Sequence, residues 1–266
     1  MELRTELERV GAERDRYRDD LEALRRDPLS VIQAKLTYLG DRINRVDRRI
    51  DRLPALLLTE MQAMQQLFQR FSPRATLPLI AGWALSPRGL LTLTDLIADT
   101  DAHLVLECGS GTSTLWMAYA LQRKGGGKAI ALDHLPEYAD RTRAMIHAHG
   151  LDDFADVRLS PLVPRATPRG EFLWYDFDAD SLAGPIEVLL VDGPPGDTGP
   201  HARYPALPVL VDHLAVGAHV LMDDVNRRDE REVLDIWLSE VPGLSRLVPP
   251  GMGLELLTVT GCHRRD

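Results

Sequence analysis

The chain has 266 residues, 44% hydrophobic and 27% charged, which is enough for one α/β domain with an appendage. It contains no apolar run of the roughly 18 residues that a membrane-spanning helix requires. We therefore expect no membrane span. The net charge of −9 is uneven, because residues 1–53 hold 13 Lys/Arg against 12 Asp/Glu and the rest hold 18 against 28. Because an acidic surface repels a phosphate backbone, we expect small-molecule or glycan substrates and no nucleic-acid partner.

The N-terminus is charged throughout and lacks the apolar centre and cleavage site of a secretory signal. The two cysteines, Cys108 and Cys262, are far apart and have no metal-ligand spacing. We therefore expect both to be reduced thiols in a cytoplasmic protein.

Two heptad seams occupy the first part of the chain. The first runs from Leu3 to Leu24 with alternating four- and three-residue steps, and Pro28 interrupts it. The second contains Ile32, Leu36, Leu39, Ile43, Val46, Ile50 and Leu53. Charged flanks leave a stripe so narrow that a coiled coil is favoured over a helix packed on its own domain. We expect a homo-oligomer through residues 1–53, with a parallel dimer favoured by the β-branched Ile43 and Ile50 and a trimer as the alternative.

Pro54 is expected to end or kink the second helix, with a further helix over residues 56–71. From about residue 72 the sequence changes to segments punctuated by proline and glycine. We therefore expect a helical oligomerisation region over residues 1–71 and a second domain over residues 72–266.

From His103 onward, short β-rich runs alternate with helical ones, which is typical of a mostly parallel sheet with helices on both faces. The fold class expected is α/β, a doubly wound, mostly parallel, seven-stranded Rossmann-like sheet behind an α-helical coiled coil. The candidate strands are residues 103–108, 129–134, 156–160, 186–192, 218–223 and 254–260, with a weaker seventh at 246–248.

A glycine-containing turn follows the first strand, in the run ECGSGTST from Glu107 to Thr114, and a helical pattern starts near Leu115. Glycines at such a turn let the backbone approach a ligand, and the helix N-terminus offers unpaired amides. Nicotinamide-binding folds open in the same way. Here, however, Thr114 replaces the third glycine of their motif and Glu107 precedes the first glycine by two residues. A carboxylate at that position suits a ligand ammonium better than a pyrophosphate.

The second strand ends at Asp133 and His134. A carboxylate at this tip can accept both hydroxyls of a ribose, and the alternative is a helix cap. His134 contacts the ligand or faces solvent. Ser160 and Pro161 follow the third strand, at the same edge of the sheet.

Asp192 ends the fourth strand, and Asp223 and Asp224 end the fifth. The carboxyl ends of parallel strands meet at one edge of the sheet, so these three carboxylates should converge and repel one another. A divalent cation would relieve the repulsion, and Mg²⁺ is expected because it prefers oxygen ligands. The alternative is that these residues are capping and turn aspartates without a metal.

Taken in order, these motifs resemble those of bacterial class I S-adenosylmethionine-dependent methyltransferases that modify sugars and natural products. The resemblance spans roughly residues 72–261 and includes Gly82-Trp83-Ala84, the loop after Glu107, Asp192-Gly-Pro-Pro-Gly, residues 202–208, and Asp223-Asp224 followed by Arg227 and Glu230. Catechol-type and macrolide-sugar O-methyltransferases hold Mg²⁺ at such aspartates. Asp224 stands where the catechol type usually has Asn, and the sugar type has an Asp pair.

The resemblance implies a set of ligands for S-adenosylmethionine, namely Glu107, Gly109, Ser110, Gly111, Thr112, Ser113, Asp133, His134, Ser160, Pro161 and Asp192. It also implies Mg²⁺ on Asp192, Asp223 and Asp224.

The function expected is metal-assisted O-methylation of a sugar or natural-product hydroxyl. Asp192 and His201 are the candidate catalytic residues. His201 is the first candidate for the general base and His134 the second, and the alternative is that His201 is an ordinary loop residue. Arg203 and Tyr204 contact the substrate or pack beneath the loop. One alternative is a coiled-coil scaffold whose domain binds the cofactor without turnover. The other is a nicotinamide-dependent oxidoreductase, which Glu107 and Thr114 disfavour.

Overall fold

A computed structural model describes residues 14–15, 17–19, 22, 28–78, 84–247 and 253–261. Most of the first heptad seam, Gly82, Trp83 and Cys262 lie outside these residues. The chain divides into two compact units, residues 1–58 and 59–266. No helix in the described ranges combines the length and the apolar character needed to cross a bilayer.

Helix α2 (Pro28–Arg70) runs without a break through Pro54. Of the two alternatives expected at Pro54, an end or a kink, an end of the helix followed by a separate helix over residues 56–71 is therefore wrong. Proline removes one backbone hydrogen bond inside a helix. Because residues 50–55 are exposed, water can satisfy the carbonyl group that loses its partner.

The last turns of α2 belong to the second unit. Ala63, Leu67 and Phe71 are buried there. The Glu60 carboxylate accepts a hydrogen bond of 3.0 Å from the backbone N–H of Arg88, at the start of α3 (Pro87–Asp99). This packing explains why the compact unit begins at residue 59.

The second unit is built on a seven-stranded sheet. The strands are β1 (Leu104–Cys108), β2 (Lys128–Asp133), β3 (Ala155–Leu159), β6 (Ile186–Val191), β7 (Leu214–Met222), β8 (Leu244–Arg246) and β9 (Glu255–Val259). Their order is β3-β2-β1-β6-β7-β9-β8. Pairing is parallel from β3 to β7, whereas β9 pairs antiparallel with β7 and with β8. The predicted mostly parallel sheet is confirmed.

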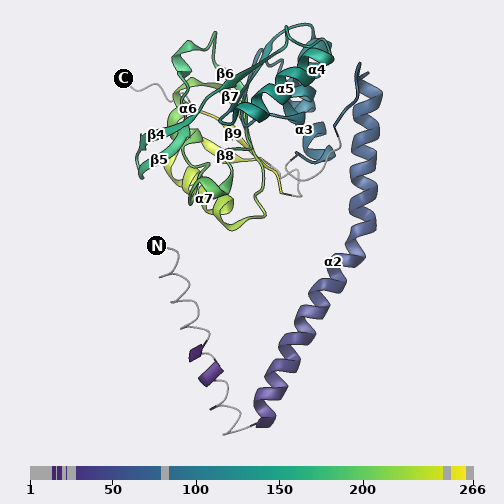
Figure 1. Ribbon diagram of the computed structural model, residues 1–266, viewed down its shortest axis with the longest axis vertical. Helices are drawn as coiled ribbons and strands as arrows, with labels where there is room; N and C mark the ends of the chain where they lie inside the picture. The colour runs from purple at the N-terminus through teal and green to yellow at the C-terminus, as the bar shows by residue number, and fades with distance from the viewer. Residues whose placement is uncertain are drawn as a thin grey trace. The chain divides into compact units, whose positions relative to one another are not determined.

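Helices cover both faces of this sheet (Figure 1). On one face lie α3, α4 (Thr112–Lys124) and α5 (Pro136–Ala148), and on the other α6 (Ala206–Leu210) and α7 (Arg228–Glu240). Val105 packs in the first core with Leu115, and its neighbour Leu106 packs in the second with Trp237. Alternate residues of a central strand therefore fill opposite cores, which explains why the candidate strands are apolar throughout.

A hairpin of β4 (Leu162–Thr167) and β5 (Gly170–Tyr175) forms a separate antiparallel pair that was not among the predicted strands. Trp174 and Tyr175 from β5 are buried in the second core. The described residues of this unit also contain the short 3₁₀ helices η1 (Ala179–Ser181), η2 (Gly196–Thr198) and η3 (Val211–His213).

Candidate functional site

The loop between β1 and α4 forms one wall of a cavity of about 410 Å³. Ser110, Gly111, Thr112 and Ser113 line it together with Asp192. A Cβ added at Gly111 would meet no atom within 4 Å. The backbone here is therefore open to a ligand that lies against the N-terminus of α4.

Gly109 holds the turn itself. Its φ of +116° is a conformation that residues with a side chain rarely adopt. Its N–H donates a 2.8 Å hydrogen bond to the carbonyl of Leu132 on β2. An added Cβ would stand 3.6 Å from the carbonyl carbon of Asp192, so the chain after β6 passes close behind this turn.

Glu107 is buried, and its carboxylate accepts hydrogen bonds from the hydroxyls of Ser113 and Thr114, the latter at 2.5 Å. The Thr114 hydroxyl also accepts the N–H of Gly111 at 3.0 Å. Burial raises the pKa of Glu107 to about 7, against the lowering effect of the two hydroxyls. The carboxylate therefore joins β1 to the first turn of α4.

In the sequence, Thr114 was interpreted only as the residue that replaces the third glycine of the nicotinamide-binding motif. Its hydroxyl bonds both the Gly111 N–H and the Glu107 carboxylate. A threonine in the first turn of a helix often makes such local bonds, so its presence in the sequence could have indicated this role.

Asp133 uses both carboxylate oxygens at the tip of β2. Its Oδ2 accepts the Ser110 hydroxyl at 2.5 Å, and its Oδ1 accepts the N–H of Leu135 at 3.0 Å. Leu135 is itself the N-cap of α5, and this helix has no side-chain cap hydrogen bond, so the contact fixes the turn before the helix and is not the helix cap considered as the alternative to ribose binding. His134 lies beside it, with Nδ1 3.9 Å from the Asp133 Oδ1.

The segment after β3 lies next to this strand tip. Ser160 is buried, and its N–H donates a 2.7 Å hydrogen bond to the carbonyl of Asp133. Pro161 is exposed, and its carbonyl accepts the N–H of Asp176 at 2.8 Å. The backbone after β3 is thereby fixed between β2 and the end of the hairpin.

Asp192, Asp223 and Asp224 converge at the carboxyl ends of β6 and β7. Each offers a carboxylate oxygen, and these oxygens lie within 4.8 Å of one another. Backbone hydrogen bonds run from Asp192 to Cys108 at 3.0 Å and from Asp223 to Val191 at 3.1 Å, so the strand ends are held together. The three acids form a set of oxygen donors that fits a divalent cation.

Arg203 lies among these acids with only 4% of its side chain exposed. Its Nη2 is 2.8 Å from the Asp224 Oδ2 and 3.5 Å from the Asp192 Oδ1. Its Nη1 donates a 2.9 Å hydrogen bond to the carbonyl of Asp223. Of the two roles considered for Arg203, pairing beneath the loop is the one that the structure places here.

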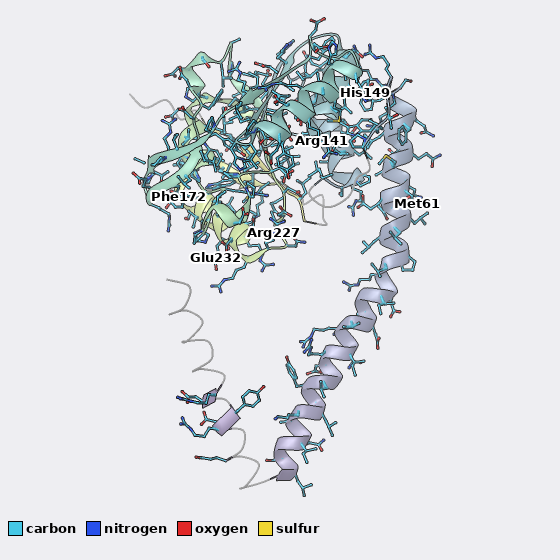
Figure 2. All side chains as sticks on the ribbon, in the orientation of Figure 1. Met61, Arg141, His149, Phe172, Arg227 and Glu232 are labelled. Carbon is cyan, nitrogen blue, oxygen red and sulfur yellow. The ribbon has the colours of Figure 1, made fainter. Side chains whose placement is uncertain are left out.

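Arg227 adds a second cation at the N-terminus of α7, with Nη1 2.9 Å from the Asp224 Oδ2 (Figure 2). Asp224 thus has two arginine partners, whereas no ion pair to the Asp223 carboxylate is found among the described residues. Burial raises the pKa of Asp192 well above its ordinary value, and repulsion from Asp223 adds to it. Burial also raises the pKa of Asp223. Ionisation of all three acids is therefore costly here, and the two arginines offset only part of that cost.

His201 belongs to a separate cluster on the side of α7. Its Nε2 lies 2.9 Å from the Oε2 of Glu232, whose other oxygen accepts Arg228 at 2.7 Å (Figure 2). Asp229 also offers an oxygen within 4.8 Å of this pair. In the described ranges His201 makes no hydrogen bond or ion pair with the three aspartates.

Tyr204 is fully buried and donates a 2.8 Å hydrogen bond to Glu240, so it packs beneath the loop rather than lining the site. Burial, together with that carboxylate, raises the pKa of Tyr204 to about 12. Cys108 is a buried free thiol at the end of β1.

Residues 106–225 match the family model described as a methyltransferase domain. A crystal structure of the cofactor-bound protein Rv0187 from MTB is 23% identical, with a TM-score of 0.50, covering 81% of this chain and 96% of that one. An O-methyltransferase from Bacillus cereus in complex with SAH is 19% identical, with a TM-score of 0.50 and coverage of 74% and 90%. A methyltransferase from Geobacter sulfurreducens is 19% identical, with a TM-score of 0.51 and coverage of 79% and 97%. No curated protein matches the sequence.

Proposed function

We propose that this chain, which carries a class I S-adenosylmethionine-dependent methyltransferase domain over residues 106–225, methylates a hydroxyl oxygen of a sugar or natural product with the help of a divalent metal. The observation that carries the proposal is the convergence of Asp192, Asp223 and Asp224 beside the loop after β1. The name of the Bacillus cereus protein, an O-methyltransferase, supports the same type of acceptor atom.

For the cofactor, the proposed ligands lie along one path over the strand tips. The open backbone at Gly109 to Gly111 and the amides of Thr112 and Ser113 would hold the methionine part, with the Glu107 carboxylate as partner of its ammonium. Asp133 and His134 would bind the ribose, and Ser160 and Pro161 would border the adenine. S-adenosylmethionine supplies the electrophilic methyl group when bound.

For the metal, Asp192, Asp223 and Asp224 would be the ligands of Mg²⁺, because they offer oxygen atoms only. When bound, the cation would orient neighbouring hydroxyls of the acceptor and lower their pKa. Arg203 fixes Asp192 and Asp224 from beneath and so holds the ligands in place. Positioning of the acceptor oxygen is the main contribution that the chain itself makes to methyl transfer.

His201 is proposed as the general base on its position in the loop after β6 alone, because its ring pairs with Glu232 in a cluster separate from the three aspartates. That pairing is at Nε2, which leaves Nδ1 as the atom that would receive the proton. Asp192 is proposed to act beside the reacting atoms, since it lines the cavity and directly follows the central strand β6.

The helical region is proposed to join copies of the chain through residues 1–53, with a dimer favoured. Its remaining residues, up to 71, are proposed to link it to a catalytic domain over residues 72–266, although the helix from residue 59 onward already packs in the second unit. The substrate is proposed to be a small molecule or glycan rather than a nucleic acid, and the protein to be cytoplasmic. The half-exposed seam of α2 also supports the second candidate, a scaffold that binds the cofactor without turnover.

Methyl transfer to a panel of glycosides and phenolic or polyketide hydroxyls, measured with S-adenosylmethionine and Mg²⁺, tests the proposal and separates it from the scaffold. We expect turnover on at least one hydroxyl acceptor, and none on the matched acceptor in which that hydroxyl is already methylated. Binding of S-adenosylhomocysteine without any turnover across the panel would favour the scaffold.

A further inference from the structure

The unit-1 part of α2 carries an apolar seam that is about half exposed along its whole length. The exposed fractions are 49% for Ile32, 59% for Leu36, 50% for Leu39, 59% for Ile43, 52% for Val46, 55% for Ile50 and 49% for Leu53. An isolated helix of this kind is marginal in water, because most of its stability must come from burying the seam.

The unbroken helix fixes which residues flank the seam. With Leu36, Ile43 and Ile50 at heptad position a and Leu39, Val46 and Leu53 at d, Pro54 falls at position e. The proline therefore lies beside the seam and does not interrupt it. The seam continues at Leu57, 62% exposed, and stops at Glu60, whose carboxylate is bonded to Arg88.

The two flanks of the seam carry opposite charges. Lys35 and Arg42, both exposed, occupy position g, and residue 49 at the next g position is also arginine. Asp47, exposed, is the charged residue on the e flank, which also contains Gly40 and Pro54. Within one helix the Arg42 guanidinium lies 5.9 Å from the centre of the Tyr38 ring.

In a parallel, in-register pair of helices, each g residue faces the e residue five positions later on the other helix. Arg42 then faces Asp47 of the second copy, twice per dimer. In an antiparallel pair, g faces g, which brings three basic positions against three basic positions. The almost balanced charge of residues 1–53, 13 basic against 12 acidic, removes any general repulsion between copies.

We infer that a second copy of this chain covers the seam, in parallel and in register, with Arg42 of each copy paired to Asp47 of the other. This inference rests on the proposed self-association and adds its register and the charged pair, Arg42 with Asp47, that selects the expected parallel arrangement. Burial of the seam stabilises the pair, and the e and g charges choose the parallel arrangement over the antiparallel one.

Disulfide trapping reads the orientation directly. Leu39→Cys and Leu53→Cys, tested separately in the full-length protein, place a thiol near each end of the seam. In a parallel in-register dimer each variant forms a covalent dimer on mild oxidation, whereas in an antiparallel dimer at most one of them does. Asp41→Cys, on the opposite side of the helix, is the matched control, and the wild-type chain controls for Cys108 and Cys262.

A charge exchange tests the Arg42–Asp47 pair by sedimentation equilibrium. We expect Arg42→Glu or Asp47→Arg to raise the dimer dissociation constant about tenfold, since each change replaces two attractions by two repulsions. The double variant R42E/D47R should restore wild-type affinity. Circular dichroism of each variant shows whether the helix is retained.

The outcomes separate the two ideas. A wild-type monomer at micromolar concentration would overturn self-association itself. A wild-type dimer that cross-links at only one cysteine position, or that the double variant fails to restore, would overturn the parallel pairing and leave self-association standing. Neither result depends on methyl transfer, which is measured separately.

Discussion

The Nη2 atom of Arg203 lies 2.8 Å from the Oδ2 of Asp224, and the same guanidinium reaches the backbone carbonyls of Asp192 and Asp223. One buried cation thus ties together the ends of β6 and β7. Arg203 thus compensates part of the charge of the three acids. The effect of this arginine on stability can therefore be measured separately from any effect of a metal.

Replacement of Arg203 by methionine should therefore destabilise the metal-free protein by about 3 kcal/mol, because it leaves buried acids without their cation. Urea denaturation measures the free energy of unfolding, with and without Mg²⁺. Mg²⁺ should stabilise this variant more than the wild type. Arg246→Met, at a half-exposed arginine on β8, is the control and should change the stability little.

Metal dependence is tested at Asp223, whose carboxylate has no ion pair among the described residues. Methyl transfer should vanish in excess EDTA and return with Mg²⁺ or Mn²⁺, and Asp223→Asn should abolish it without loss of S-adenosylhomocysteine binding. Asp235→Asn, at an exposed residue of α7, should behave as wild type. Full activity in EDTA would mean that these aspartates act as caps or bases.

Gly111 offers a sharper test of cofactor binding than Gly109. Gly111→Val would direct a side chain into open space beside the loop, so we expect the fold to survive and the affinity for S-adenosylhomocysteine to fall by at least a factor of ten, measured by calorimetry. Gly109→Ala must keep a φ of +116°, which destabilises the protein itself. An unchanged affinity of a folded Gly111→Val variant would place the cofactor elsewhere.

Glu107 gives the cofactor-free protein a pH dependence of known sign. Burial raises its pKa from the ordinary 4.5 to about 7, so between these values the folded state holds a proton that the unfolded state has released. This group therefore makes the free energy of unfolding fall as pH rises through that window, by about 3 kcal/mol in all.

Glu107→Gln should remove that dependence, so the variant should gain stability over the wild type at pH 8 and little at pH 5. Urea denaturation at both pH values measures the difference, with the exposed Glu137→Gln as control. The same variant should bind S-adenosylhomocysteine more weakly. A stability difference that does not vary with pH would contradict the raised pKa.

Much of the second unit could be predicted, because its strands are short apolar runs buried on both sides and its site residues directly follow them. The β4–β5 hairpin was missed since Pro164 interrupts its first strand, and since its turn at Pro168 and Arg169 has its glycine, Gly170 with a φ of +111°, directly after the two turn residues and not within them. Its stability comes from Trp174 and Tyr175 in a core shared with distant residues, which local patterns do not reveal.

The continuity of α2 through Pro54 and the position of Arg203 could not be predicted, because both depend on what surrounds the residue in the folded chain. Pro54 fits inside α2 because water surrounds the affected turn. Arg203 lies among Asp192, Asp223 and Asp224 because of the path of the loop after β6, which no local sequence motif predicts. The sequence could therefore indicate that these acids need a cation, but not that an arginine of the same chain lies among them.

The hydrogen bonds around the loop after β1 have a consequence for how fast and how tightly a ligand binds. The Ser110 hydroxyl is bonded to Asp133, the Gly111 N–H to Thr114, and the Ser113 hydroxyl to Glu107, so the partners of these groups all belong to the protein itself. The conformational entropy of this loop is therefore lost when the protein folds and not when the cofactor arrives. Binding should resemble insertion into a rigid receptor, with an association rate set by diffusion and access, and with little added protection of these amides against hydrogen exchange beyond direct contact.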